Sequence, residues 1–528
     1  MKFHKVKFLI VLLIVALVAA GCSDSGDNSS GNENDGNTEK GGELNIALNA
    51  SPPSLDQPAT AAAATRDTAM LMYETLVTVD AEYKTVPMLA ETIDLSDDGK
   101  EYTFHLREGV KFHNGKEMIA EDVIASMERW LEQSSLTGNI FVDATWEAED
   151  DYTVVLTLAA PSALTLDTLA TTKQAPAIMP KENIESAPAE GVEEYIGTGP
   201  FKFVEWKQDQ YIHFTKYEDY QPVEMEASGL SGKKEALVDD IFMHIVSDTS
   251  TRIAGLQSGE YDFAYDIPYD NFEQLDNDPN LETLLVPSAN AVLKFNNVQG
   301  IGSDFKLREA INTGLDLDEI MMAAFPNKDF YWLAPGYMDV NLSNWSSDAG
   351  SEYYNQNDPE KAKEMLEDMG YDGEEFRILA TRDYDYIYSL AVVIHEQLTN
   401  MGINSKLEIF DWPTLSQMTE NENELGSWDA TISGSSIVST PPQLISLSPS
   451  WAGGVNDSFI VDTMEDIELA KDHEEAKELW DTLQLYAWEE HLPTIQLGGF
   501  SKVYSLNNKI KGVETLVGPI FWNVTVEE

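Results

Sequence analysis

Segments with strand patterns and segments with helical patterns alternate along this chain from about residue 43 onward. The clearest strand segments are residues 43–48, 102–106, 154–158 and 292–295. In the helical segments apolar residues recur every three or four positions, over residues 119–131, 358–370, 387–401 and 472–490. Because the two kinds of segment are interleaved, and because no internal repeat is visible, the sequence predicts an α/β fold with mixed sheets.

The charge of the chain excludes some classes of function. Its 528 residues contain 33 Lys and Arg against 92 Asp and Glu, which gives a net charge of 33 − 92 = −59. A nucleic-acid-binding surface needs clustered basic side chains, so this balance argues against a nucleic-acid partner. Salt relieves the mutual repulsion of carboxylates, and we therefore expect a saline or alkaline habitat. The alternative is an ordinary acidic secreted protein.

The only cysteine of the chain, Cys22, follows a segment that has the features of a secretion signal. Three lysines precede an unbroken apolar run over residues 8–20, which is too short to span a bilayer as a helix and fits the core of a signal peptide. Residues 19–22 (AAGC) resemble a lipobox, with Ala19 where Leu is usual. We expect a signal peptide over residues 1–21 and lipidation of Cys22. The alternative is a buried free cysteine in a signal anchor. A single cysteine also excludes a disulfide framework and an iron–sulfur cluster.

A polar segment without large apolar side chains follows the cysteine. Residues 22–42 are mostly Gly, Ser, Asn, Asp and Glu, which is typical of a flexible tether. Cleavage would remove three lysines and leave a net charge of 30 − 92 = −62. These features predict an extracytoplasmic protein that is lipid-anchored to the outer face of the cell membrane.

Seven segments of the chain, in order, resemble one family of proteins. They are residues 54–58 (SLDQP), 73–77 (YETLV), 87–130 (which include YTFHLREGVKFHNG), 197–202 (GTGPFK), 252–262 (RIAGLQSGEYD), 305–316 and 358–370. No single motif is decisive, but their order over residues 43–512 is specific. By this resemblance the chain is identified as a member of the peptide/nickel-type extracellular solute-binding proteins of ABC importers, solute-binding family 5.

The resemblance implies a two-lobed, periplasmic-binding-protein-like fold of type II, with an extended lobe I and two crossings between the lobes. Lobe I would take residues 43–288 and a returning segment, 494–528, and lobe II would take residues 289–493. Pro and small residues at 287–290 and 492–494 suggest the crossings. Such proteins capture a ligand by hinge closure. The implied partners are a small polar ligand, with a peptide favoured, and the permease and ATPase subunits of an ABC importer. The resemblance also implies a monomer without enzymatic activity or a cofactor.

The resemblance places one ligand site on a strand edge of lobe II. In peptide-binding members an extended ligand adds to a strand edge in a GW..D segment, whose Asp pairs with the amino terminus of the peptide. Residues 428–439 match that segment, with Ser435 where the Trp would be and Val438 near the position of the Asp. The amino-terminal anchor is therefore not visible. The ligand-binding candidates here are the backbone and hydroxyl groups of Ser433, Gly434, Ser435 and Ser436.

Two tyrosines supply further ligand-binding candidates. Tyr384 and Tyr386 lie in residues 382–386, which look like the family's loop at the cleft, and tyrosine offers flat apolar area with a polar tip. The alternative is a solvated helix start, in which Asp383 and Asp385 are favoured by the helix dipole.

Three more candidates come from other parts of the chain. Trp412, in the sequence Asp-Trp-Pro, would either cover the ligand or pack lobe II. Thr65 and Arg66 follow an early proline-containing loop and resemble the lobe I side of the cleft.

Metal binding and enzyme chemistry are the alternatives to capture of an organic solute. The eight histidines form no close ligand pair, and His395 begins HEQLT rather than the HExxH zinc motif, so no metal site is predicted. GxSxG, P-loop and GxGxxG motifs are absent. Acidic pairs occur throughout, so a secreted hydrolase of the glycosidase type stays an alternative. A receptor that senses a peptide signal without importing it is another.

Overall fold

The computed structural model describes residues 41–188 and 191–527. The predicted signal peptide, Cys22 and the predicted tether up to residue 40 lie outside these residues. The described chain belongs to one compact unit, residues 39–528. Within the described residues, no helix is both long enough and apolar enough to cross a membrane.

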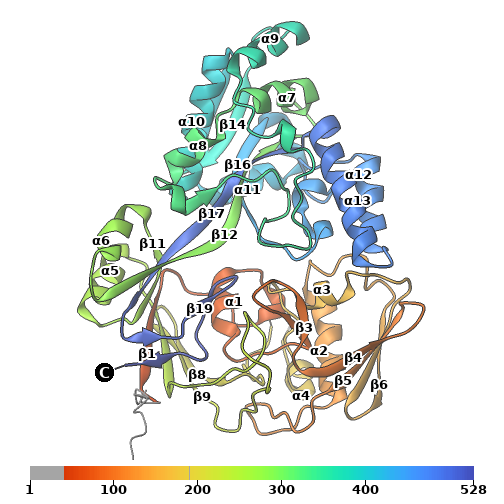
Figure 1. The fold of residues 1–528 in the computed structure, drawn as a ribbon, viewed down its shortest axis with the longest axis vertical. Helices are drawn as coiled ribbons and strands as arrows, with labels where there is room; N and C mark the ends of the chain where they lie inside the picture. Colours follow the sequence, from red (N-terminus) through yellow and green to blue (C-terminus); the bar gives the residue numbers. More distant parts are fainter. Residues whose placement is uncertain (1–40, 189–190, 528) are drawn as a thin grey trace, which may run out of the picture. The chain divides into compact units, whose positions relative to one another are not determined.

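A mixed sheet of eleven strands runs through this unit (Figure 1). Its strands are β1 (Glu43–Leu48), β8 (Phe201–Lys207), β9 (Tyr211–Lys216), β10 (Asp240–Ile245), β11 (Phe263–Ile267), β12 (Leu281–Phe295), β13 (Tyr331–Trp332), β14 (Phe376–Thr381), β15 (Ser405–Phe410), β16 (Ala430–Ser436) and β17 (Thr494–Asn507). The order is β15-β14-β16-β12-β17-β11-β1-β10-β9-β8, and β13 pairs with β17. Parallel pairs, such as β1 with β10, stand beside antiparallel pairs, such as β9 with β10. The predicted mixed sheet is confirmed.

The two long strands of the sheet, β12 and β17, connect its two halves (Figure 1). They pair antiparallel along almost their whole length. Residues 289–295 of β12 also pair with β16, whereas residues 503–506 of β17 pair with β11. Each long strand therefore has one end in each half of the sheet. The ladder between them shifts register between Pro287 and Ala289, where proline cannot donate a backbone hydrogen bond.

The half of the sheet that contains β1 is accompanied by a second, antiparallel sheet of order β4-β5-β7-β6. Its strands are β4 (Ala90–Leu95), β5 (Glu101–Leu106), β6 (Thr145–Asp150) and β7 (Thr153–Thr157). A two-stranded sheet, β2 (Val77–Val79) with β3 (Thr85–Pro87), precedes it. The helices of this half are α1 (Ala63–Ala69), α2 (Ala120–Gln133), α3 (Thr165–Leu169), α4 (Lys181–Glu185), α5 (Thr249–Ser258) and α6 (Phe272–Asp276). The strands predicted at 43–48, 102–106 and 154–158 and the helix predicted at 119–131 are confirmed.

Among the described residues, seven α-helices accompany the other half of the sheet. They are α7 (Phe305–Gly314), α8 (Leu317–Ala324), α9 (Pro359–Met369), α10 (Asp385–Met401), α11 (Trp412–Glu420), α12 (Ser458–Glu468) and α13 (His473–Tyr486). Helix α9 begins where the Asp358 carboxylate accepts the Lys361 N–H at 2.9 Å, and it ends at Gly370 with a φ of +77°. The helices predicted at 358–370 and 387–401 are confirmed. The one predicted at 472–490 ends as α-helix at Tyr486 and continues as a π-helical turn, Ala487–His491, before Pro493.

The C-terminal segment after β17 returns to the β1 half of the sheet. It forms four two-residue strands, β18 (Ile510–Lys511), β19 (Glu514–Thr515), β20 (Pro519–Ile520) and β21 (Thr525–Val526). Its attachment is visible in the Asn523 side chain, whose Oδ1 accepts the Glu235 N–H at 2.7 Å.

The glycines of the GTGP motif are required by a close approach of two chain segments. A Cβ on Gly197 would lie 2.0 Å from the carbonyl oxygen of Met72, and a Cβ on Gly199 would lie 2.7 Å from that of Leu71. Neither glycine has a positive φ. Lack of space, and not an unusual backbone conformation, therefore excludes a larger residue at both positions.

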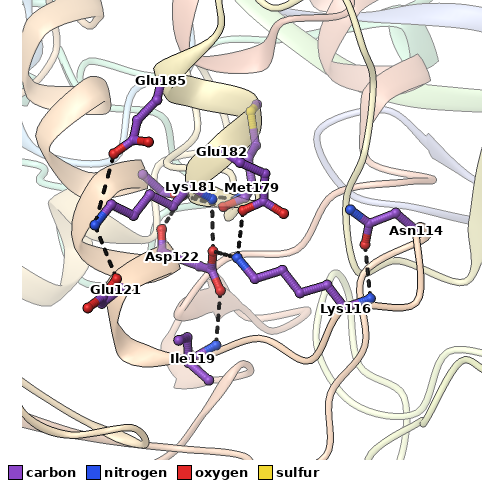
Figure 2. Close-up of polar contacts among 10 residues, drawn as sticks. Asn114, Lys116, Ile119, Glu121, Asp122, Met179, Lys181, Glu182 and Glu185 are labelled. Carbon is purple, nitrogen blue, oxygen red and sulfur yellow. Dashed lines mark hydrogen bonds and ion pairs between the residues drawn. The ribbon is translucent and has the colours of Figure 1, made fainter.

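The strongly matching segment 87–130 is held together by ion pairs and backbone hydrogen bonds around one buried carboxylate (Figure 2). Asp122 accepts hydrogen bonds from the Lys116 ammonium at 2.6 Å, from the Lys181 N–H at 2.8 Å and from the Ile119 N–H at 3.1 Å. Lys116 also pairs with Glu182 at 2.7 Å. The loop after β5, the start of α2 and the start of α4 therefore share one anchoring group.

Candidate functional site

A cleft of about 1110 Å³ lies beside the two long strands. One part of its lining comes from the β1 half of the sheet and includes Arg66 and Lys173. Another part comes from the N-terminal ends of α10 and α11 and includes the predicted aromatic residues. Residues 287–289 of β12, and Phe500 with residues 502–504 of β17, also line it. Clefts of several hundred Å³ accept drug-sized ligands, so this one is large enough for a short peptide.

The aromatic part of the lining is built at the N-terminus of α10. The Tyr384 side chain is 45% exposed, and its ring meets the Trp412 ring edge-on with centroids 5.2 Å apart. The Asp383 carboxylate accepts the Trp412 N–H at 2.7 Å, which holds the loop before α10 against the start of α11. The Tyr386 ring packs 5.0 Å from Phe500 of β17, and burial raises the pKa of Tyr386 to about 12. The structure therefore brings Tyr384, Tyr386 and Trp412 together in the cleft.

The predicted strand edge is the outer part of β16. Strand β16 pairs with β12 along all of its residues but with β14 only at Ala430 and Thr431. Among the described strands, none pairs with residues 432–436 on the β14 side. Gly434 lines the cleft, and its backbone lies so close to Tyr386 that a Cβ there would be 2.8 Å from the tyrosine hydroxyl.

The serines around Gly434 differ in their surroundings. The Ser433 hydroxyl is buried and has no hydrogen-bond partner within the described chain. Ser435 is partly buried, and the backbone of Ser436 pairs with Ala289 of β12. Val438, near the family's Asp position, is partly buried against the core. Ser433, Ser435 and Val438 are not among the residues that line the cleft.

The two residues predicted on the lobe I side have different positions. Arg66 lines the cleft and its guanidinium lies 2.7 Å from the carboxylate of Asp67. Thr65 is completely buried, and its hydroxyl donates to the Ser54 carbonyl at 2.6 Å. Thr65 therefore supports the loop under the cleft and does not line it.

Three further cationic side chains also line the cleft. Lys502 of β17 pairs with Asp266 at 3.0 Å. Arg252 is buried and donates to backbone carbonyls, among them that of Tyr265 at 3.1 Å. For Lys173, no carboxylate of the described residues lies within 4.0 Å of the ammonium. Burial and the nearby Arg66 lower the pKa of Lys173 to about 8.

Comparison with known proteins identifies the family of this chain. The family model described as bacterial extracellular solute-binding proteins, family 5, matches residues 84–457. The chain belongs to this family. The family resemblance inferred from the sequence is therefore confirmed.

Relatives of this solute-binding protein cover nearly its whole length. A probable peptide ABC transporter periplasmic-binding protein, y4tO of Sinorhizobium fredii, is 28% identical over 487 residues, which are 89% of this chain and 91% of the relative. The structure of AgaA from Agrobacterium tumefaciens, solved with agropinic acid, is 26% identical with a TM-score of 0.72 and covers 92% of this chain and 99% of its own. CtaP of Listeria monocytogenes is 22% identical with a TM-score of 0.81, over 93% of this chain and 100% of its own. These likenesses confirm the two-lobed α/β fold.

The family is one of binding proteins and not of enzymes. Within the described residues, no group of three His, Cys, Asp or Glu side chains is arranged to hold a metal ion. What the solute-binding protein offers in its cleft is a set of aromatic faces, a strand edge and a few charged groups. Such a set can bind a polar solute through hydrogen bonds and stacking without changing it chemically.

Of the residues that sequence reasoning named in lobe II, Tyr384, Tyr386, Trp412 and Gly434 line the cleft. Sequence reasoning missed Lys173, Asp266, Phe500 and Lys502, which come from segments without a matching motif. A lysine between small and polar residues, such as Lys173 in TTKQA, gives no local sign that it faces a cleft.

Proposed function

We propose that this protein captures a peptide between its two lobes and delivers it to the permease and ATPase of an ABC importer. It acts as a monomer outside the cytoplasm, anchored to the outer face of the membrane through a lipid on Cys22. The peptide transporter protein of Sinorhizobium supports the peptide class, because it is similar along nearly the whole chain.

One observation carries the proposal: within the described residues no strand pairs with residues 432–436 of β16 on the β14 side, and Gly434 of this edge lines the cleft. An extended peptide can add to a free edge through its own backbone groups, which makes the binding tolerant of peptide sequence. The aromatic residues Tyr384 and Trp412 then cover side chains of the peptide without requiring a particular one.

The pairing of the long strands supports a hinge between two lobes. We place the first crossing at residues 287–291, where the β12–β17 ladder shifts register. For the second crossing we favour residues 498–502 of β17 over the 492–494 suggested by the sequence. Residue 494 still pairs within lobe II, whereas residue 503 pairs with β11. A ligand that takes the closed form from 1% to 99% of the molecules must bind it better by about 5.5 kcal/mol.

Native mass spectrometry of the protein, purified without unfolding, tests the peptide proposal. We expect bound masses that correspond to a set of short peptides. A bound sugar, or products formed when the protein is incubated with peptides or glycans, would contradict the proposal and favour the hydrolase alternative. Loss of labelled-peptide uptake on deletion of the protein would separate import from signalling.

The lipid anchor is tested separately at its attachment site. The variant Cys22→Ser should leave the membrane fraction and appear in the soluble fraction, because a thioether cannot form at serine. If the variant stays with the membrane as the wild type does, Cys22 is not the point of attachment.

A further inference from the structure

The two halves of the main sheet carry a second contact away from the long strands, where α12 and α13 lie beside α3 and the loop after α2 (Figure 1). The Ala163 N–H donates to the Ala470 carbonyl at 3.0 Å, and the Gln443 amide donates to the Leu136 carbonyl at 3.2 Å. These four residues are not among those that line the cleft. We call this contact the second seam; it joins residues 134–142 and 162–168 to residue 443 and residues 467–473.

One carboxyl group of the second seam is buried. Glu468, at the C-terminal end of α12, is 6% exposed and lies against the loop after α2. A Cβ on Gly138 of that loop would be 2.9 Å from its carboxylate oxygen. Burial raises the pKa of Glu468, and hydrogen bonds from Asn139 offset only part of this effect. The buried position therefore favours the protonated carboxyl group.

The second seam also contains an ion pair that needs a proton. The Asp167 carboxylate of α3 is 13% exposed, accepts the Thr85 hydroxyl at 2.6 Å and lies 3.6 Å from Nε2 of His473, the first residue of α13. An imidazole carries a charge for this carboxylate only when it is protonated, and histidines as a class lose that proton near pH 6.5. Burial raises the pKa of Asp167, and the charge of His473 opposes this shift. With or without ionisation of Asp167, the closed seam therefore favours a bound proton.

The surroundings of these groups act in the same direction. The other titratable side chains nearby are acids and phenols: Glu82, Tyr83, Tyr102, Glu465, Glu474 and Glu475. Lys471 pairs with Asp472 and Glu475 at 4.0 and 3.9 Å. The added carboxylates repel the ionised forms of Asp167 and Glu468 and so favour the uptake of protons. The two phenols stay neutral up to alkaline pH, because burial raises the pKa of both.

We propose that the second seam is a proton-operated latch, in which a proton on Glu468 and a proton on His473 beside Asp167 hold the two lobes closed over the cargo. The inference rests on the proposed hinge and not on the class of cargo. A proton that binds the closed form better than the open form shifts the population toward closure. Both contributions have the same sign, so the protein holds its cargo more tightly in mildly acidic medium and releases it more readily in alkaline medium.

A distance measurement between two nitroxide labels on the cargo-free protein tests the latch. The labels are attached at Thr145→Cys and Ser458→Cys, which replace exposed residues outside the seam, one on each half. Cys22→Ser in the full-length chain removes the only native thiol. The medium contains 1 M NaCl, which screens the repulsion between distant surface carboxylates. The ratio of closed to open molecules should rise at least about tenfold between pH 8 and pH 5.

Three variants locate the effect. Glu468→Gln is uncharged at every pH, so it should raise the closed fraction at pH 8 and make the ratio depend less on pH. His473→Gln cannot form the ion pair and should lower the closed fraction at pH 5. The matched control is Asp462→Asn, which removes the same charge from an exposed position of α12 and should behave as the wild type does. An unchanged circular dichroism spectrum shows that each variant folds.

Three results would overturn the latch. The first is a wild-type ratio that stays the same between pH 8 and pH 5. The second is a pH dependence that survives in full in both Glu468→Gln and His473→Gln. The third is a response of Asp462→Asn as large as that of Glu468→Gln, because net charge and not the seam would then govern closure.

A tryptic digest of casein, added at pH 8, separates the latch from the function on which it rests. If the digest closes the wild type and acid does not, the hinge stands and the latch is wrong. If acid closes the wild type and the digest does not, the latch is supported and only the peptide cargo is contradicted. If neither changes the distance, the proposed hinge closure is wrong, and the latch is wrong with it.

Discussion

At the scale of single residues, Gly434 is a position where the cleft leaves no space for a larger side chain unless Tyr386 moves. A Cβ there would lie 2.8 Å from the Tyr386 hydroxyl, and the Tyr386 ring is held by Phe500 at 5.0 Å. We expect Gly434→Ala to displace Tyr386 and to weaken binding of the co-purified peptide by about tenfold, or about 1.4 kcal/mol, in calorimetry. The matched control is Gly426→Ala, whose nearest contact would be 3.6 Å away. Equal dissociation constants for the two variants would contradict the role of Gly434.

Asp122 is a second residue whose replacement should lower the stability of the fold by a predictable amount. It is fully buried and accepts three hydrogen bonds, one of them from the Lys116 ammonium at 2.6 Å (Figure 2). An amide in its place cannot neutralise Lys116, so Asp122→Asn should lower the free energy of unfolding by about 3 kcal/mol in urea titrations. Glu182→Gln removes the exposed partner of the same lysine and should cost less than about 1 kcal/mol. Equal free energies of unfolding for the two variants would contradict this role of Asp122.

The lowered pKa of His113 should make the free energy of unfolding depend on pH. Its Nδ1 accepts the Gly197 N–H at 3.3 Å and its Nε2 donates to the Gly199 carbonyl at 3.0 Å, so the neutral ring is the form that fits. Burial lowers the pKa of His113 to about 4 from an unfolded value near 6.5. Between these values the unfolded chain binds the extra proton. The free energy of unfolding should therefore fall by up to about 1.4 kcal/mol per pH unit as the pH drops from 6.5 to 4.

The variant His113→Gln isolates this contribution from that of the many carboxylates. Between pH 6.5 and 4 the free energy of unfolding of the variant should change less per pH unit than that of the wild type. The difference in slope should be up to about 1.4 kcal/mol per pH unit, which corresponds to the uptake of one proton. Parallel pH profiles for wild type and variant would show that His113 titrates normally in the folded protein.

At the scale of secondary-structure elements, the proposed pairing of a peptide with β16 predicts which changes in the peptide weaken its binding. Strand addition uses the backbone of the ligand, and alternate residues of an added strand face the edge. We expect N-methylation of the bound peptide to weaken binding about tenfold at alternate positions and little at the positions between. Single alanine replacements along the peptide should each change the affinity less than about threefold. A large effect at one side chain and none from N-methylation would argue against pairing with β16.

At the scale of the whole molecule, the excess of 59 negative charges opposes the folded state. Raising the salt concentration from 0.1 M to 1 M shortens the Debye length from about 10 Å to about 3 Å and screens this repulsion. We therefore expect the urea midpoint to be higher in 1 M NaCl than in 0.1 M NaCl. An unchanged midpoint would mean that repulsion between surface carboxylates contributes little to stability, and the expected saline habitat would lose its support.

Much of the architecture follows from local sequence signals. Asp358 and Gly370 mark the two ends of α9 because a carboxylate can cap the first turn and a glycine can adopt the positive φ that ends the last. The order of the family motifs identified the two-lobed fold. These properties depend on neighbours in the chain or on motifs of a few residues, and both can be read without the tertiary structure.

The cleft itself could not be predicted in full, because its lining comes from segments far apart in the chain. The cleft brings together side chains from both halves of the sheet, which β12 and β17 join: Arg66, Lys173, Tyr384 and Lys502. Local pattern does not tell whether a loop lysine faces a cleft, or that Thr65 is buried while its neighbour Arg66 is not. The sequence by itself determined most of the elements and the family. Only the tertiary structure decided which charged side chains line the cleft, because this depends on packing between segments far apart in the chain.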